Sequence, residues 1–266
     1  MCCSEFGFCG STTEFCTWKN SADSNYAQCS TQYGGYGAAK RPTCSGGASV
    51  SKLNVGYYES QANTRSCQQV APEDLNLDGF TSINFAFSFF DATSFKITPM
   101  DSNGRSLYSR FTALKSKKPD LQAFISVDGW SFTDPSPTQQ AYSKMVSNAA
   151  NRATFIKNIM NFMDSYGFDG VDLDCEYPSA DDRGGIALCK EMSAAFGTKY
   201  SMTVTIPTSY WYLQHFNLSG MQDSISWFNL MAYDLYGVWD AESKYVGPYI
   251  APYTNVTEID LALDLL

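Results

Sequence analysis

The pattern of hydrophobic and polar residues from Leu53 onward alternates between short apolar runs and longer stretches with helical spacing. The apolar runs have the length of strands, and they are expected at residues 53–58, 81–90, 121–127, 171–177, 201–207 and 225–234. Helical spacing is expected at residues 105–117, 151–166, 186–196 and 256–266. Asn151 is the expected N-cap of the second of these helices.

Strands separated by helical crossovers predict an α/β fold with a parallel sheet. About six βα units are compatible with a doubly wound sheet or with an incomplete (β/α)8 TIM barrel. No glycine-rich phosphate loop follows the first strand, which weighs against a nucleotide-binding doubly wound sheet. The barrel is the favoured interpretation, because polar groups that project inward from a strand are typical of barrel active sites.

The fourth strand carries three acids at every second position. Asp172, Asp174 and Glu176 therefore share one face, with about 6.5–7 Å between successive members. One interpretation is a solvated acidic face on an edge strand. The other is a set of carboxyls that point into the barrel, where burial and mutual repulsion keep at least one of them protonated near neutral pH. Glu176 lies nearest the mouth and is the expected general acid.

Composition narrows the possible functions. Eighteen Lys and Arg against 27 Asp and Glu give a net charge of −9, which argues against nucleic acid or an anionic membrane as partner. The single histidine, His215, argues against a histidine-rich metal site or a Ser-His-Asp triad, and we expect no cofactor and no metal. Aromatic residues make up 15% of the chain, which suits a site that stacks on sugar rings. No apolar run is long enough to predict a membrane span.

The nine cysteines are distributed unevenly, since six fall in the first 44 residues. This density predicts a disulfide-stapled module in an oxidising compartment, and zinc is the weaker alternative because paired CxxC spacing is missing. The sequons at Asn217 and Asn255 agree with a secreted, extracellular protein. No signal peptide precedes the first cysteines, so we expect the natural start to lie upstream. The predicted domains are a cysteine-rich module at 1–29, a Gly/Ser-rich linker at 30–51 and a barrel at 52–266.

The segment DGVDLDCEYP at 169–178 resembles the DGxDxDxE signature of family 18 glycoside hydrolases, the chitinases. Other landmarks of that family are similar and stand in the same order: GYY at 56–58, SVDGW at 126–130 and MAYD at 231–234. The segments SYWYLQHF and DLYGVWD resemble the fungal branch that includes killer-toxin-like chitinases. The resemblance covers residues 53–266.

The resemblance implies a retaining mechanism in which the substrate supplies its own nucleophile. Glu176 would protonate the glycosidic oxygen, and the 2-acetamido oxygen of the substrate would attack the anomeric carbon. Asp174 would hold the acetamido N–H, and Asp172 would share a proton with Asp174. Tyr233 would donate a hydrogen bond to the acetamido group.

The resemblance also implies residues that bind the sugar or support the acids. Asp234 would orient the sugar, and Tyr57 and Ser126 would support the aspartate pair, although both also suit simple barrel filling. Met231 would pack beneath the sugar, and Trp130 would contact substrate.

Four departures from the family pattern are visible. Asp128 stands where the family usually has glycine, which adds a charge or near-charge close to the site. Cys175 replaces a common tryptophan but is expected to face away from the barrel interior, and Gln61 replaces a tryptophan of the fungal branch. Strands seven and eight are missing, so we expect the chain to be part of a longer protein and to be poorly stable or inactive alone.

The segment CCSEFGFCGSTTEFC at 2–16 resembles the second half of a hevein-type chitin-binding domain. The resemblance assigns the sugar contacts to Ser4, Phe6, Phe8 and Phe15 and pairs Cys2 with Cys16. A small core formed by the three phenylalanines is the alternative. The pairing stays open for the remaining cysteines: Cys3, Cys9, Cys29, Cys44, Cys67, Cys175 and Cys189.

Three functions follow as hypotheses. The first is a chitinase that cleaves β-1,4-N-acetylglucosamine linkages in chitin or chitooligosaccharides. The second is a non-catalytic chitin-binding protein or the targeting subunit of a toxin, whose partner subunit is unknown. The third is an endo-β-N-acetylglucosaminidase that acts on glycoproteins.

Overall fold

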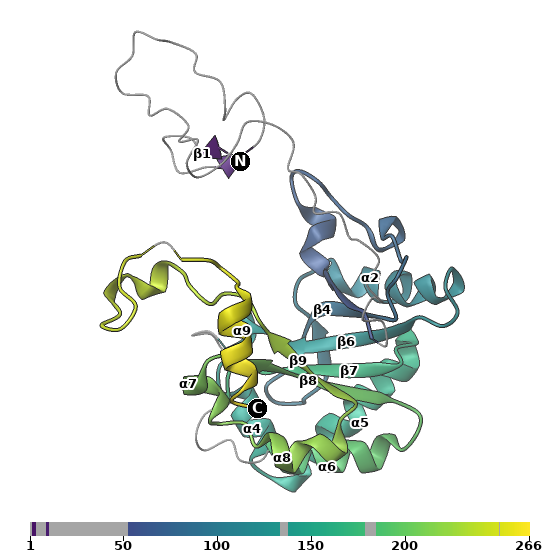
Figure 1. Cartoon of the computed structure of the whole chain (residues 1–266). Helices are drawn as coiled ribbons and strands as arrows, with labels where there is room; N and C mark the ends of the chain where they lie inside the picture. The colour runs from purple at the N-terminus through teal and green to yellow at the C-terminus, as the bar shows by residue number, and fades with distance from the viewer. Residues whose placement is uncertain (1, 4–8, 11–52, 134–137, 179–184, 250) are drawn as a thin grey trace. The chain divides into compact units, whose positions relative to one another are not determined.

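The computed structural model describes residues 2–3, 9–10, 53–133, 138–178, 185–249 and 251–266 (Figure 1). The chain divides into two units, Met1–Val50 and Ser51–Leu266. In the first unit, strands β1 (Cys2–Cys3) and β2 (Cys9–Gly10) form a short antiparallel pair.

One sheet organises the second unit. Its parallel strands are β3 (Val55–Glu59), β4 (Ser82–Phe90), β6 (Gln122–Asp128), β7 (Gly170–Asp174), β8 (Ser201–Pro207) and β9 (Trp227–Met231). They pair in the order of the sequence, and β5 (Ile97–Pro99) adds an antiparallel ribbon to β4. A doubly wound sheet reverses its strand order partway, whereas a barrel adds each new strand on the same side. The observed order is therefore that of a barrel.

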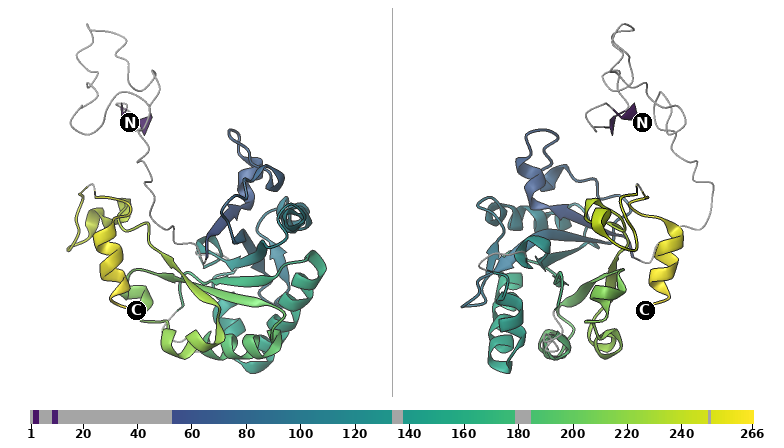
Figure 2. Two further views of the ribbon diagram at one scale, coloured as in Figure 1. Left: turned by 45° about the vertical axis from the view of Figure 1, so that its right-hand side comes forward. Right: turned by 90° about the vertical axis from the view of Figure 1, so that its left-hand side faces the viewer.

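Two contacts across the interior show that the sheet is curved. The Tyr57 hydroxyl on β3 lies 2.9 Å from a carboxyl oxygen of Asp172 on β7, although β4 and β6 separate these strands in the sheet. The rings of Phe124 on β6 and Trp227 on β9 have centroids 5.5 Å apart across β7 and β8. Figure 2 shows this curvature, and we call the concave inner face of the sheet the trough. The six parallel strands form a half-barrel, as predicted for an incomplete TIM barrel.

The second unit also contains helices of two lengths, several of which cover the outer face of the sheet (Figure 2). The longer ones are α2 (Gly104–Thr112), α5 (Ala149–Tyr166), α6 (Gly185–Phe196) and α9 (Val256–Leu263). The short ones are α3 (Trp130–Thr133), α4 (Ala141–Val146), α7 (Tyr210–Leu213) and α8 (Leu218–Met221). The 3-10 turns are η1 (Ser60–Thr64), η2 (Pro72–Asp74), η3 (Ala113–Ser116), η4 (Gln222–Ser224) and η5 (Val238–Glu242). Within the described ranges, none of these helices has the length and apolarity needed to span a bilayer.

The core lies between the sheet and this helical layer. Phe85, Phe111, Ile125, Phe155 and Leu188 come from β4, α2, β6, α5 and α6, and all are fully buried. Burial of side chains of this size is worth about 1.5–3 kcal/mol each, so the outer face of the sheet is where most of the stabilising area is removed from water.

The predicted N-cap of α5 is wrong by one turn. Helix α5 begins at Ala149, and its N-cap is Asn148, whose side chain accepts a hydrogen bond from the Asn151 backbone N–H at 2.9 Å. Asn151 is the third helical residue, and its side chain donates to the carbonyl of Lys144 instead. Both asparagines can cap a helix, and the two alanines between them are good helix formers, so the helix extends to the earlier one.

Several predicted elements are shorter than expected. The predicted helix at 105–117 divides into α2 and η3, and α9 ends at Leu263. Strand β7 ends at Asp174 instead of continuing to Tyr177, and β9 spans only the central part of 225–234. Strand β7 pairs with β6 only as far as Asp174, where β6 ends as well.

The amino end of β7 is tied down by the first acid of its motif. Asp169 accepts hydrogen bonds from the Ala123 backbone N–H at 2.9 Å and from Lys115 Nζ at 2.7 Å. Gly170 follows, and a Cβ there would lie 2.5 Å from both the Phe124 ring and the Ser201 carbonyl oxygen. Asp169 and Gly170 therefore fix the start of the strand, and the three acids that follow are held in register by its neighbours.

Candidate active site

Asp172 lies at the centre of the trough and is fully buried. Its carboxyl accepts hydrogen bonds from Tyr57 Oη at 2.9 Å, Ser126 Oγ at 2.8 Å, Thr203 Oγ1 at 2.6 Å and Asn229 Nδ2 at 3.0 Å. The Thr205 hydroxyl adds a longer contact at 3.3 Å. The four shorter hydrogen bonds come from four different strands and match the capacity of a group that only accepts. Asp172 is thus a fixed part of the interior.

Sequence reasoning found two of these donors and missed the others. Tyr57 and Ser126 contact Asp172, as expected for residues that support the aspartate pair. Thr203, Thr205 and Asn229 were not anticipated. The available signal was the Thr-Val-Thr alternation in β8, which places two hydroxyls on the face opposite the core residues of that strand.

Asp174 is the next acid along β7, and it is 4% exposed. Its Oδ1 atom is buried and has no hydrogen-bond partner among the described residues. Burial, followed by the charges of Asp172 and Glu176, raises the pKa of Asp174 well above its usual value. This direction agrees with the prediction that at least one carboxyl of the acid strand holds a proton near neutral pH.

Glu176 lies just beyond the end of β7 and is half-buried, so it is the most accessible of the three acids. Its backbone carbonyl accepts a hydrogen bond from the hydroxyl of Thr133 at the end of α3. Its charge also raises the pKa of the neighbouring Tyr177, after the larger effect of burial. Glu176 is therefore at the mouth of the trough, where the sequence predicted it.

The carboxyl end of β9 adds a second group of predicted residues. Met231 is buried at the end of the strand, and Tyr233 and Asp234 follow it. Burial, then the charges of Asp174 and Glu176, raise the pKa of Tyr233 to about 12, so its hydroxyl remains a donor. Asp234 is exposed and forms a side-chain hydrogen bond with Tyr253.

A row of aromatic rings leads away from Glu176. The ring centroids of Trp130 and Tyr177 are 6.4 Å apart, and Tyr177 stacks on Tyr212 at 4.2 Å with an interplanar angle of 21°. Trp130 is 56% exposed and Tyr212 is 38% exposed, so both offer a face to solvent. The sequence identified Trp130 but missed Tyr177 and Tyr212. For Tyr212, the available signal was the dense aromatic run at 209–216.

Asp128, at the end of β6, is buried and pairs in register with Asp174. Burial, then the charges of Asp174 and Glu176, raise the pKa of Asp128 well above its usual value. The alternative that Asp128 adds a full charge is therefore disfavoured, and a neutral carboxyl close to the acids is favoured. Cys175, between the last two acids, is buried, and its thiol interacts with the Asp128 carboxyl.

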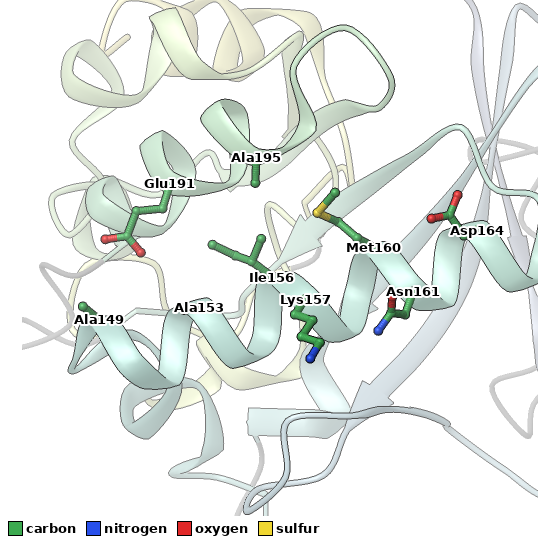
Figure 3. A pocket seen from close by; sticks show the side chains of 9 residues that line it. All are labelled: Ala149, Ala153, Ile156, Lys157, Met160, Asn161, Asp164, Glu191 and Ala195. Carbon is green, nitrogen blue, oxygen red and sulfur yellow. The ribbon is translucent and has the colours of Figure 1, made fainter.

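A separate groove of about 590 Å³ lies between α5 and α6 on the outer helical layer (Figure 3). Its lining is mostly alanine, isoleucine and methionine side chains. Its two carboxylates are already paired, Glu191 with Arg152 and Asp164 with Lys199. The groove therefore offers no converging polar groups, and the acids of β7 lie elsewhere.

The predicted sugar contacts of the N-terminal module lie outside the described residues, as does one half of its predicted disulfide. These residues are Ser4, Phe6, Phe8, Phe15 and Cys16. In the second unit, Cys67 is exposed and Cys189 is buried, and neither forms a disulfide within the described residues.

The family model of glycosyl hydrolases family 18 matches residues 54–260, which include β3 to β9 and the acid strand. The chain belongs to this family. The matched range contains the half-barrel and all three acids of the acid strand.

Individual relatives are chitinases and a toxin. The chain is 30% identical to "Secreted chitinase LysM12" of Penicillium expansum over 284 residues, covering all of this chain and 18% of the relative. It is 29% identical to "Killer toxin subunits alpha/beta" of Kluyveromyces lactis over 283 residues, covering all of this chain and 23% of the relative. The chain thus spans about a fifth of the length of these curated relatives.

A solved structure shows the same fold. Catalytic domain 2 of the Group II chitinase of Ostrinia furnacalis superposes with a TM-score of 0.68 and 26% identity. The superposition covers 80% of this chain and 60% of that domain. Similarity at this level supports the half-barrel assignment.

Proposed function

We propose that this chain carries the catalytic carboxyls of a chitinase that cleaves β-1,4-N-acetylglucosamine linkages with retention of configuration. The observation that carries the proposal is the gradient of exposure along β7. Asp172 is fully buried, Asp174 is nearly so, and Glu176 is half-buried at the mouth. Only Glu176 can reach the oxygen of an incoming polysaccharide, while the deeper acids can act on the sugar below it.

In this mechanism Glu176 transfers its proton to the glycosidic oxygen as the bond to the anomeric carbon breaks. The 2-acetamido oxygen of the substrate forms the new bond to that carbon, which gives an oxazolinium ion. No group of the enzyme becomes covalently modified. Water then attacks the same carbon from the opposite face, the bond between that carbon and the acetamido oxygen breaks, and the water gives a proton to Glu176. The acid is thereby restored, and the reaction consumes only water.

Asp174 has the properties needed to hold the acetamido N–H. It is buried and carries an oxygen without a partner among the described residues, so it can accept a hydrogen bond from substrate. Asp172 shares a proton with it, and when that proton is on Asp172 one of the hydroxyls around it accepts a hydrogen bond instead of donating one. Negative charge on this pair stabilises the developing oxazolinium cation, and the effect is strong because water is excluded.

The residues at the rim are proposed to bind the sugar. Tyr233 donates its hydroxyl hydrogen to the acetamido group, and Asp234 orients the sugar ring. Met231 packs beneath the ring. Trp130 contacts the chain of the polysaccharide, which suits an exposed aromatic face.

The assignments outside the barrel are proposals too. Residues 1–29 are a partial hevein-type module that binds chitin, and residues 30–51 are a linker. The protein is secreted, in agreement with its relative "Secreted chitinase LysM12". Its origin in the killer-toxin-like fungal branch is supported by the toxin relative.

The test compares full-length protein with its Glu176→Gln variant on chitooligosaccharides. Removal of the general acid is expected to lower kcat by about 10²–10⁴-fold while binding to chitin beads persists. Glu73→Gln is the matched control, because it removes an exposed carboxyl that pairs with Arg110 on the outside of the barrel. Oligosaccharides without 2-acetamido groups should not be cleaved, because they lack the nucleophile.

Two outcomes would replace the proposal. If wild type and Glu176→Gln are equally inert and both bind chitin beads, the protein is a chitin-binding protein or a toxin targeting subunit. The toxin relative gives that alternative specific support. Release of glycans from glycoproteins, with chitin left intact, would identify an endo-β-N-acetylglucosaminidase.

A further inference from the structure

Asp128 is placed directly beside the acid strand. It is the last residue of β6, and it pairs in register with Asp174, the last residue of β7. The backbone N–H of the next residue, Gly129, donates to the Asp174 carbonyl at 2.7 Å, which fixes the two strand ends together. The position of Asp128 is thus tied to that of Asp174 through the backbone.

Two features of Asp128 are unfavourable for stability. Its φ of 95° lies in the region that side chains other than glycine rarely adopt. Its carboxyl is 2% exposed, and neither oxygen has a hydrogen-bond partner among the described residues, although the Cys175 thiol is near enough to influence it. Asp172, by comparison, is fully satisfied by four donors. Strain and an unsatisfied carboxyl at one position point to a role other than packing.

Few titratable groups face Asp128. Asp174, Cys175 and Glu176 face it from β7 and the residues that follow. On its other side, the side chains of β4 and of α3 include none that titrates. Asp128 is therefore surrounded by acids and apolar groups, with no cation among the described groups that influence it.

Asp174, like Asp128, has a carboxyl oxygen that lacks a hydrogen-bond partner among the described residues. Its Oδ1 atom is buried and accepts no hydrogen bond from the described residues. Asp172, Glu176, Tyr57 and Tyr233 all interact with its charge. Tyr57 already donates to Asp172, so that hydroxyl is not free for Asp174.

We propose that Asp128 is a positioning residue for Asp174: it stays protonated and donates its carboxyl hydrogen toward the unsatisfied oxygen of Asp174. This rests on the proposed function, because it assigns Asp128 to the reaction of the same site. A neutral carboxyl is one of the few groups at this position that can donate without adding charge. The donated hydrogen keeps Asp174 oriented, and the same oxygen retains a second lone pair that can accept the substrate N–H.

The consequence appears in the pH dependence of the reaction. Burial and the two neighbouring charges raise the pKa of Asp128, so it retains its hydrogen at the pH where the acids work. A hydrogen bond to the ionised form of Asp174 lowers the pH at which the aspartate pair takes up a second proton. Asp128 therefore extends activity toward acid pH.

The experiment measures kcat/KM against pH for the full-length protein and two variants. Asp128→Gly removes the donor, and glycine suits the positive φ. The acid side of its kcat/KM profile is expected to move to higher pH by about 1 pH unit. Asp128→Asn keeps an N–H donor, so its acid limb should stay with wild type. Gln68→Gly is the control, since Gln68 has a φ of 54° on an exposed loop and should leave the profile unchanged.

Two kinetic outcomes overturn the inference. Superimposable acid limbs for wild type and Asp128→Gly would show that the carboxyl only fills space. Equal shifts in Asp128→Gly and Asp128→Asn would show that a hydrogen-bond donor is not what matters.

A second measurement does not depend on turnover. Carboxyl carbon NMR of wild type and Asp128→Asn identifies the Asp128 signal, which should stay in its protonated form through neutral pH. An ionised Asp128 at neutral pH would overturn the inference even if Asp128→Gly does not fold. If wild type cleaves no substrate, the proposed function fails, and this spectrum still decides whether Asp128 is protonated.

Discussion

Replacing Asp172 with alanine should destabilise the fold strongly, because the carboxyl organises four strands. The change leaves Tyr57, Ser126, Thr203 and Asn229 without their shared acceptor. Ser126 and Thr203 are fully buried, whereas Tyr57 and Asn229 are partly exposed. Each buried donor left without a partner costs about 1–3 kcal/mol. The middle of that range for the two fully buried donors, Ser126 and Thr203, gives about 4 kcal/mol.

Part of this loss of stability is offset, because the variant no longer buries a carboxyl group. The loss of one partner from a buried charged network typically costs about 3–5 kcal/mol in total, and we expect a value in that range. For a domain of this size, 1 kcal/mol corresponds to about 2–4 °C in Tm, so the melting temperature should fall by about 10 °C.

Thermal and urea unfolding, followed by circular dichroism, measure this loss. Ser126→Ala is the graded comparison, since it removes one of the four donors and should cost about 1 kcal/mol. Glu176→Gln is the control, because Glu176 is half-buried and should change stability little while abolishing turnover. A Tm for Asp172→Ala within about 2 °C of wild type would refute the view that this carboxyl organises the interior.

Three further predictions concern stability. Gly170→Ala should lower the free energy of unfolding by several kcal/mol in urea titrations, because the new Cβ would lie 2.5 Å from the Phe124 ring and a backbone carbonyl; a neutral effect would contradict this packing. Because the pKa of Asp128 is raised in the folded state, this carboxyl lowers the stability of wild type as pH rises above about 4. The free energy of unfolding of Asp128→Asn should therefore equal that of wild type below about pH 4 and exceed it progressively above. A constant difference across pH would be inconsistent with a protonated carboxyl. Arg110 lowers the pKa of Glu73 to about 2. The stabilisation of the fold by this ion pair is therefore present above about pH 4.5 and disappears toward pH 2. Because both side chains are more than a third exposed, Glu73→Gln should lower Tm only slightly at pH 7, and 1 M salt should erase the difference.

The strands could be predicted because each is an apolar run that the core requires. Strand β8 was predicted at its exact bounds, 201–207, since Met202, Val204 and Ile206 alternate toward the helices. The position of Glu176 at the mouth also followed from the chain, because the two-residue repeat of a strand and its direction give the order of depth. These features depend only on neighbours in sequence.

The features that were missed depend on residues far apart in sequence. Thr203 and Asn229 look like ordinary strand residues until the curvature of the sheet brings them to Asp172. Tyr177 and Tyr212 stack although 35 positions separate them, and no local pattern encodes that contact. The α5 cap was missed for a local reason, since Asn148 and Asn151 both have capping chemistry and tertiary packing decides between them.

The ion pair between Lys115 and Asp169 has a practical consequence for mutational libraries of this protein. Asp169 belongs to the acidic signature, yet its carboxylate fastens the entry of β7 to η3 and β6, well away from the mouth. Library members altered at Asp169 should be recovered in low yield, with normal turnover per correctly assembled molecule. Members altered at Glu176 should be recovered in full yield and show no turnover, so expression and activity screens would divide one short signature into two separate phenotypes.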